Sequence, residues 1–322
     1  MKKQKSKKRG TTRGKIETPS KRANVQKIIV TTDFSTQSLP AVRYALALGS
    51  TIGASVTLLH VVESSSPLAG MESLVLARTD SEIEALAARQ LEALAQRESK
   101  GSVKVTTMVR TGKPFHEIAL SAGERHADLI VIATHGHTGL KHVLLGSTAE
   151  RVVRHAPCPV LTIPTRNLPK HARQAASLKL KKILVPIDFS SLSKDALPYA
   201  LLLAGHSGAE LALLHIVEKF PMDSLLGPVT NELTVPWIME AETNLEGLAG
   251  SLAKTAGVKA TAVVERGTPF ERICHTAKTA GADIIVLTTR GYTGLQHVWL
   301  GSTAERVVRH SPCPVLVVRE LE

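Results

Sequence analysis

The sequence predicts an α/β protein built from two tandem doubly wound domains, each a Rossmann-like fold with a five-stranded parallel sheet. Its 322 residues are about twice the length of a typical domain of ~150 residues. One long sequence pattern occurs twice, at a constant spacing. Within each copy, short apolar runs such as DLIVIAT at 128 to 134 alternate with helix-length segments. Near-continuous apolar strands require a parallel sheet that is covered on both faces.

The repeat defines the domain organisation. KIIVTTDFS at 27 to 35 returns as KILVPIDFS at 182 to 190, and the block GLKHVLLGSTAERVVRHAPCPVL at 139 to 161 returns as GLQHVWLGSTAERVVRHSPCPVL at 294 to 316, so both recur at a spacing of 155. Each unit is domain-sized, which indicates a tandem duplication and not a solenoid. We predict a basic disordered tail (1–24), a first domain (25–164), a polar and basic linker (165–181) and a second domain (182–322).

The expected elements follow in order along the first copy. Strands are predicted at 27 to 32, 55 to 62, 103 to 110, 128 to 134 and 159 to 163, and helices at 36 to 52, 80 to 99, 114 to 126 and 146 to 155. The second copy repeats the strands at 182 to 187, 210 to 217, 258 to 265, 283 to 289 and 314 to 318. Gly112 and Gly267 are expected to end strands, and Pro114 and Pro269 to open helices, because a first-turn proline loses no needed donor.

Composition excludes several classes of protein. Aromatic residues make up 3% of the chain, too few for a nucleic-acid surface of stacked rings. The three cysteines are too scattered for a disulfide framework or a four-ligand zinc site. No apolar run is long enough for a transmembrane helix, and the basic N-terminus lacks the apolar stretch of a secretory signal. We therefore expect a cytoplasmic protein.

The positive charge is concentrated in residues 1–22, where ten Lys and Arg face Glu17 alone, giving +9 of the formal net charge of +12. Such a run without apolar periodicity is expected to be disordered. It is either a solvated tail without a dedicated partner or a weak contact for nucleic acid or another anionic surface.

Candidate binding residues fall where strands end, which is where open parallel sheets bind ligands. Asp33 and Asp188 close the first strand of each copy, and the fourth strand is followed by glycines nine residues apart that lead into Ser-Thr. Glycines let a backbone approach a phosphate closely, and the N–H groups and dipole of a helix start attract anions. The alternative is structural: Ser147 to Glu150 matches a capping box, in which the helix satisfies its own N–H groups.

Other candidates are weaker. His135 and His137 lack a third ligand nearby, so no metal site is predicted. His60 and His215 lie on strands and are expected to be structural. Cys158 and Cys313 stand between prolines and are expected to pack in the core, without a redox role.

With these motifs, each copy resembles the universal stress protein family, and the chain is similar to a two-domain tandem member. The resemblance rests on KIIVTTDFS and KILVPIDFS, on LLHVVE and LLHIVE, and on the two GSTAERVVRH blocks. It implies the adenine nucleotide alpha hydrolase-like fold, a five-stranded parallel sheet between helices. It also implies ATP binding in members that carry G-x2-G-x9-G-[S/T].

Transferred residue by residue, the resemblance implies two adenine-nucleotide sites, for ATP with or without Mg²⁺. The implied residues are Asp33, Val61, Ala133, Gly136, Gly146, Ser147 and Thr148, with Asp188, Ile216, Gly291, Gly301, Ser302 and Thr303 in the second copy. The first motif glycine is replaced by Ala133 and by Thr288. Because a β-branched Thr crowds the backbone more than a methyl group does, we expect the N-terminal site to be the better one.

Two functions remain open at this stage. One is a nucleotide-binding regulatory protein of the stress response, with no dedicated catalytic base and at most slow ATP hydrolysis. The other is an interaction or scaffold protein that needs no nucleotide, its halves packed as a pseudo-dimer through PVLTI and PVLVV, with further homo-oligomers open.

Overall fold

The computed structural model describes residues 23–63, 80–99, 103–134, 145–165, 178–190, 192–218, 228–289 and 300–319. The first half contains β1 (Lys27–Thr31), α1 (Leu39–Ile52), β2 (Ser55–Val62), α2 (Asp80–Glu98), β3 (Val105–Thr111), α3 (Pro114–Glu124), β4 (Leu129–Ala133), α4 (Ser147–His155) and β5 (Val160–Ile163). The second half contains β6 (Lys182–Pro186), η1 (Leu192–Asp195), α6 (Ala196–Ser207), β7 (Glu210–Val217), α8 (Pro228–Ala256), β8 (Ala260–Arg266), α9 (Pro269–Thr279), β9 (Ile284–Thr288), α10 (Ser302–His310) and β10 (Val315–Val318). All ten strands expected from the sequence are present.

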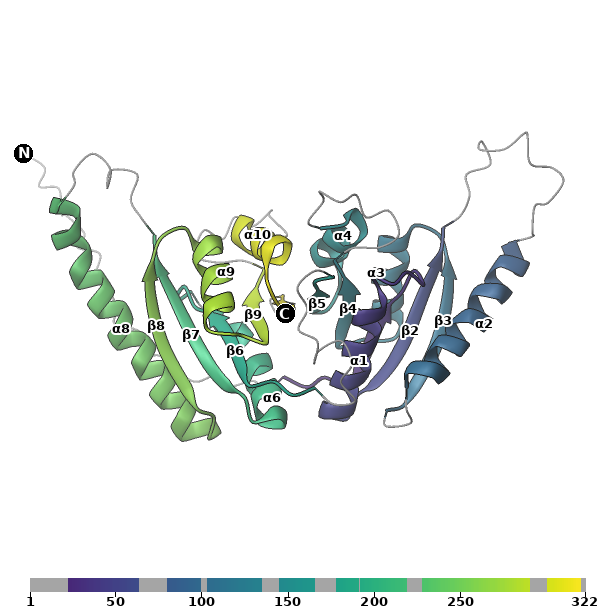
Figure 1. The fold of residues 1–322 in the computed structure, drawn as a ribbon, viewed down its shortest axis with the longest axis horizontal. Helices are drawn as coiled ribbons and strands as arrows, with labels where there is room; N and C mark the ends of the chain where they lie inside the picture. The colour runs from purple at the N-terminus through teal and green to yellow at the C-terminus, as the bar shows by residue number, and fades with distance from the viewer. Residues whose placement is uncertain are drawn as a thin grey trace, which may run out of the picture.

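The strands form one continuous sheet in the order β3-β2-β1-β4-β5-β10-β9-β6-β7-β8. Within each half every pairing is parallel, and the strand order is doubly wound, as predicted. The halves join through β5 and β10, which pair antiparallel with Leu161 opposite Leu316. The expected pseudo-dimer packing through the last strands is therefore confirmed, and Figure 1 shows the two halves related across this seam.

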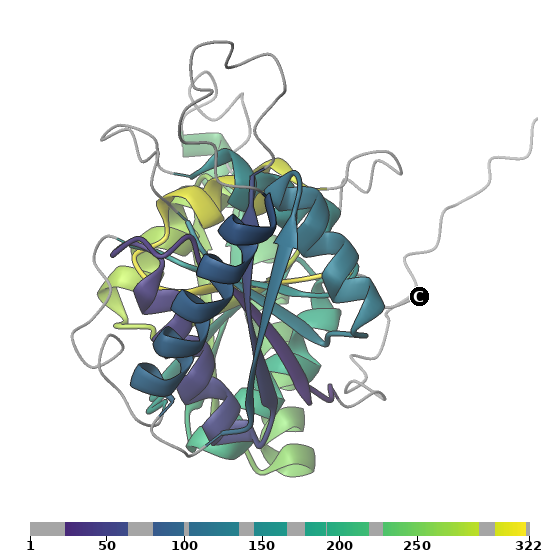
Figure 2. The same cartoon turned by 90° about the vertical axis from the view of Figure 1, so that its right-hand side faces the viewer.

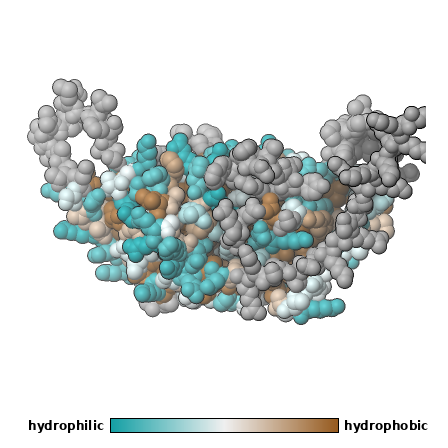
Figure 3. All heavy atoms as spheres, turned by 180° about the vertical axis from the view of Figure 1, so that it is seen from behind, coloured by the Kyte–Doolittle hydropathy of each residue, from teal (hydrophilic) through white to brown (hydrophobic). Residues whose placement is uncertain are grey.

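Helices cover both faces of the sheet because its strands alternate apolar side chains between two cores. Ile28 and Val30 of β1 pack with α1, α2, α6 and α8 in one core. Ile29 packs with α3, α4, α9 and α10 in the other. Figure 2, a view onto the first half from its outer side, shows helices on both sides of the strands. Seen from behind, the described surface is mainly hydrophilic, with apolar side chains in small separate patches (Figure 3).

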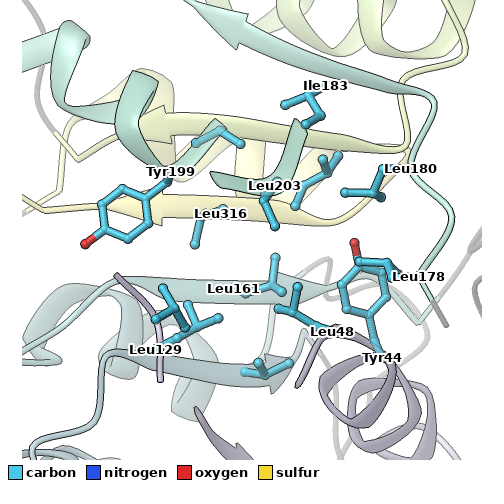
Figure 4. Close-up of a cluster of buried hydrophobic side chains, with 14 of the residues drawn as sticks. Tyr44, Leu48, Leu129, Leu161, Leu178, Leu180, Ile183, Tyr199, Leu203 and Leu316 are labelled. Carbon is cyan, nitrogen blue, oxygen red and sulfur yellow. The ribbon is translucent and has the colours of Figure 1, made fainter. Parts of the chain in front are cut away.

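The seam between the halves is part of the hydrophobic core that α1, α2, α6 and α8 cover. In Figure 4, Tyr44, Leu48 and Leu161 of the first half face Leu203 and Leu316 of the second. Leu161 and Leu316 are buried, and burying a leucine side chain contributes about 1.5–3 kcal/mol. The two halves therefore share a hydrophobic core instead of touching at a polar surface.

The far end of the expected linker takes part in this core. Leu178 and Leu180 are buried and join the same cluster, and the Leu178 N–H donates to Thr51 Oγ1 of α1 at 3.1 Å. Residues 166–177 of the linker and residues 1–22 of the basic tail lie outside the described residues, so their predictions stay predictions. Ala23 already packs against the core.

Four charged side chains cross the seam on the face covered by α4 and α10. Arg154 lies 3.1 Å from Glu150 on its own helix and 3.9 Å from Glu305 of α10. Arg309 lies 3.0 Å from Glu305 and 3.8 Å from Glu150. These four residues, called here the Arg–Glu quartet, connect the two helices that open with Gly-Ser-Thr.

The glycines and prolines at the ends of strands and the starts of helices mostly lie where the sequence predicts. Gly112 and Gly267 follow β3 and β8 with φ of 148° and 145°, a region that glycine adopts without a Cβ clash. Pro114 and Pro269 stand in the first turns of α3 and α9 as expected. The first helix begins at Leu39 and not at residue 36, because a turn forms first.

Candidate functional site at the carboxyl edge of the sheet

A cavity of about 470 Å³ opens at the carboxyl ends of β1, β2 and β4. Its walls come from those strand ends, from the starts of α3 and α4, and from the side of α2. β1 lies between β2 and β4, so the chain connections leave it in opposite directions, which is where doubly wound sheets bind ligands. The volume falls within the roughly 300–1,000 Å³ of small-molecule sites.

The cavity brings together most of the residues predicted for the first half. Asp33, Val61, Ala133, Gly146, Ser147 and Thr148 all line it. Gly136 and Gly291 lie outside the described residues. In the second half, Asp188 follows β6, Ile216 lies near the end of β7, and Gly301, Ser302 and Thr303 open α10.

Asp33 is held by a turn directly after β1. Its Oδ1 accepts hydrogen bonds from the N–H of Ser35 at 3.0 Å and from the Ser35 hydroxyl at 2.5 Å. Asp188 makes the same turn with Ser190, at 3.0 and 2.6 Å. The turn and the binding interpretations of this aspartate are therefore compatible: local hydrogen bonds fix one carboxylate oxygen while the residue lines the cavity.

The next residue is strained in both halves. Phe34 and Phe189 each have φ of 62°, the left-handed region that costs a non-glycine residue about 1–3 kcal/mol and is concentrated at functional sites. The Phe34 N–H donates to Thr32 Oγ1 at 3.0 Å, which helps to hold this conformation. Phe34 lines the cavity, and the sequence analysis did not select it. A phenylalanine follows the strand-end aspartate in both repeats, and this could have indicated that it belongs to the site.

His60 and His215 join the first two strands of their halves. The Nδ1–H of His60 donates to the Thr32 carbonyl at 2.8 Å, and that of His215 to the Ile187 carbonyl at 2.7 Å. Phe34 packs on the His60 ring with centroids 4.3 Å apart. Burial lowers the pKa of His215, which favours its neutral form. Both histidines therefore have the backbone partners expected of structural residues, and His60 also lines the cavity.

The start of α4 contradicts the capping-box interpretation. Gly146 is the N-cap residue, its N–H donates to the Thr134 carbonyl at 2.7 Å, and Ser147 is already helical. Among the described residues no side chain caps this helix, and Glu150 pairs with arginines in the quartet. α10 begins the same way at Gly301. The helix starts therefore present N–H groups and Ser-Thr hydroxyls without a capping side chain, an arrangement suited to an anion.

One wall of the cavity was missed by the sequence analysis. This wall is one side of α2. It consists of two pairs of residues, Ile83 with Ala87 and Leu86 with Gln90, and the members of each pair are four positions apart. Leu86 is 40% exposed, which is high for a leucine on the inner side of a helix. The i, i+4 spacing was visible in the sequence, but only the fold shows that this stripe extends past the sheet core to the strand ends.

Thiol and metal chemistry find no support in the described residues. Cys158 and Cys313 are buried, and burial raises the pKa of each thiol to about 12, as expected for packing residues. Among the residues described, no three His, Cys, Asp or Glu side chains lie close enough to hold a metal ion. His135 and His137 lie outside this part of the chain.

None of the described helices is both long and apolar enough to cross a membrane.

Comparison with known proteins identifies the family. The sequence profile of the Universal stress protein family matches twice, over residues 24–164 and 179–319. The chain belongs to the universal stress protein family. It is a tandem member, since both halves match. A universal stress protein of Mycolicibacterium smegmatis is 29% identical over 306 residues, covering 91% of this chain and 96% of the relative.

Two further relatives agree with this assignment. Universal stress protein MJ0531 of Methanocaldococcus jannaschii is 36% identical over 140 residues, which is 44% of this chain and 82% of the relative. The crystal structure of a universal stress protein from Archaeoglobus fulgidus covers 91% of this chain and 98% of its own, with a TM-score of 0.64 and 23% identity. That similarity supports the fold of the tandem universal stress protein.

Proposed function

We propose that the first half of this tandem universal stress protein binds an adenine nucleotide, ATP with or without Mg²⁺, as a regulatory ligand in the stress response. The observation that carries the proposal is the cavity, which is lined by Asp33, by Val61 and by the start of α4, where no described side chain caps the helix. The polar end of the cavity, at the start of α4, suits the phosphates of a nucleotide, and the apolar wall of α2 suits its base.

Each part of the cavity has a role in this proposal. The N–H groups at the start of α4, with the hydroxyls of Ser147 and Thr148, receive the phosphates, which the helix dipole also favours. Asp33 accepts from ribose hydroxyls, and the end of β2 at Val61 borders the adenosine part. Ala133 borders the cavity with only a methyl group, which leaves room for the ligand.

We propose binding without efficient catalysis. Asp33 is engaged by Ser35, and His60 donates to a backbone carbonyl, so both side chains have structural partners at the strand ends. A general base for phosphoryl transfer must reach the attacking water in a suitable protonation state. Slow hydrolysis at most is therefore expected, and the bound nucleotide acts through conformation or partner choice.

Calorimetric titration with ATP and Mg²⁺ tests the proposal, with Gly146→Val as the variant and Gly301→Val as its matched control in the other half. Gly146 has φ of −71°, which a side chain also adopts, so α4 is expected to form normally in the variant. The added side chain blocks the close approach of the phosphates. Losing one charge-assisted hydrogen bond of about 1.5–3 kcal/mol alone would weaken binding at least about tenfold.

Two results would overturn the proposal. One is the absence of binding heat and of thermal stabilisation at millimolar ATP, which would leave the nucleotide-independent scaffold as the working function. The other is unchanged ATP affinity of the first half in Gly146→Val, which would place the nucleotide elsewhere.

A further inference from the structure

The last helix of the first half carries a motif that the observed structure leaves unused. Ser147 and Glu150 have the residue types and the spacing of a capping box, in which the serine hydroxyl caps the helix and the glutamate accepts from the serine N–H. In the structure α4 instead has Gly146 as its N-cap residue, and Ser147 is the first helical residue. The sequence is therefore compatible with two helix starts, which differ in what occupies the first N–H groups.

The observed start is open to an anion. The Gly146 N–H donates to the Thr134 carbonyl at 2.7 Å, which ties the N-cap residue to the end of β4. The Glu150 N–H, which a Ser147 cap would need, donates to the Gly146 carbonyl at 3.0 Å. Among the described residues no side chain caps the helix, and Ser147 and Thr148 line the cavity. This is the helix start that a phosphate needs.

The carboxylate of Glu150 contacts two arginines. Arg154 donates to its Oε1 at 3.1 Å, and a guanidinium nitrogen of Arg309 lies 3.8 Å from its Oε2. Arg154 lies one turn later on α4, whereas the capping-box partner Ser147 lies one turn earlier. Both oxygens of Glu150 thus face cations, and the side chain is directed away from the helix start.

One of these arginines belongs to the other half of the molecule. The antiparallel pairing of β5 and β10 places α10 beside α4, and Figure 1 shows the two helices on either side of the seam, at the same end of the molecule. Arg309 is itself anchored by Glu305, to which it donates at 3.0 Å. The side chains of Arg309 and Glu150 are 38% and 31% exposed. Since one partly exposed ion pair is weak, we expect both arginines to be needed to hold Glu150.

A glutamate that capped α4 would oppose a nucleotide in two ways. It would occupy an N–H group that the phosphates need, and it would place a negative charge beside them. The positive end of a helix dipole stabilises a carboxylate as it stabilises a phosphate, so the self-capped start competes with ligand binding. The position of Glu150 therefore determines whether the helix start is available.

We propose that Arg309 is a positioning residue for the nucleotide site of the opposite half. With Arg154, it holds Glu150 away from the start of α4; without the two arginines, Glu150 caps the helix and closes the site. This inference rests on the proposed function, because it names what keeps that site open. Nucleotide binds only the open start, so the apparent affinity falls with the fraction of molecules that are open.

Hydrogen exchange tests the helix start without any nucleotide. The exchange of the Ser147 N–H with solvent, followed by NMR, is compared between the wild-type chain and Arg154→Gln/Arg309→Gln. In the double variant Glu150 accepts from this N–H, and exchange is expected to slow by about fivefold, as for one helix cap. Adding Glu150→Ala is expected to restore the wild-type rate, because no carboxylate remains to cap the helix.

Calorimetric titration with ATP and Mg²⁺ measures the effect on the site. The Gly301→Val background restricts the measurement to the first half. Arg154→Gln/Arg309→Gln is expected to weaken ATP binding by about fivefold, since closing by one cap leaves only a minor open fraction. Arg309→Gln alone is expected to weaken it by about twofold, as for the loss of one partly exposed ion pair. Adding Glu150→Ala to the double variant is expected to restore the affinity.

The matched control is Arg151→Gln/Arg306→Gln. It removes the same two charges from the same two helices, but these arginines pack over phenylalanine rings, Arg151 over Phe115 and Arg306 over Phe270, each at 5.0 Å from the ring centroid. Both arginines are exposed. This control is expected to leave the ATP affinity and the exchange of the Ser147 N–H unchanged.

The outcomes separate this inference from the proposed function. If the exchange of the Ser147 N–H is the same in the double variant and the wild type, the inference fails and the proposed function is untouched. An ATP affinity that falls equally with and without Glu150→Ala would mean that the arginines act on the nucleotide by charge alone, which also overturns it. So would an Arg154→Gln variant that equals the double variant, because Arg309 would then have no part. If the first half binds no ATP, the proposed function fails, and the exchange experiment still decides whether Arg309 holds the helix start open.

Discussion

The two halves of the molecule share their strand ends and differ in the helix that covers them. Asp33 and Asp188 make the same turn, and Phe34 and Phe189 adopt the same φ of 62°. Yet α2 has 19 residues and α8 has 29. Short-range hydrogen bonds and strand register constrain a strand end from several sides, whereas a covering helix is constrained only along its buried stripe. Among the described helices, the difference in length between the halves is therefore largest for α2 and α8.

A second difference lies at the end of the fourth strand of each half. Ala133 is buried and lines the cavity, while Thr288 stands at the same position of the second half and is partly exposed. A β-branched side chain occupies more space beside the phosphate-binding helix start than a methyl group does. We therefore expect the first half to bind ATP more tightly than the second. The halves meet in one seam, and three pairs of variants test whether corresponding residues contribute equally to stability at the seam and at the strand ends.

The largest expected effect is at the seam, where Leu161 and Leu316 are 1% and 3% exposed and lie opposite each other. Leu161→Ala and Leu316→Ala are each expected to lower the free energy of unfolding by about 2–5 kcal/mol, because each leaves a cavity in a shared core. Urea unfolding measures this. Leu120→Ala is the control, since Leu120 is 44% exposed and its truncation is expected to change stability by less than about 0.5 kcal/mol. A seam variant as stable as this control would contradict the shared core.

A smaller effect is expected at the strand-end turns. Asp33→Ala and Asp188→Ala each remove the acceptor of two hydrogen bonds and are expected to cost about 1–2 kcal/mol of unfolding free energy, equally in both halves. Asp→Asn at either position keeps an acceptor oxygen and is expected to cost less. Thermal or urea unfolding measures both pairs. Clearly unequal costs would show that the two turns are not energetically equivalent.

The smallest effect is expected from the Arg–Glu quartet. The side chains of Glu150 and Glu305 are 31% and 29% exposed, so solvent screens their ion pairs. Glu150→Gln and Glu305→Gln are each expected to destabilise by less than about 1 kcal/mol, and by less again in high salt. Urea midpoints at low and high ionic strength measure this. A loss that is large or independent of salt would mean that the quartet is more strongly desolvated than its exposure indicates.

Much of the fold followed from local sequence patterns. The runs ending in Asp33 and Asp188 predicted first strands, and the block around Gly146 and Gly301 predicted the glycine start of the last helix in each half. The capping-box interpretation of Ser147 and Glu150 was wrong because Glu150 pairs with arginines, one of them in the other half. A partner 159 positions away in the sequence cannot be recognised from a four-residue motif.

By itself, the sequence determined that this protein is a duplicated parallel α/β unit, because apolar periodicity and turn residues act locally and are repeated at a constant spacing. Only the tertiary structure decided which side chains share a cavity and that Phe34 and Phe189 are strained. These depend on how far a helix extends past the sheet and on which strand ends meet, and both are set by packing between segments distant in the chain.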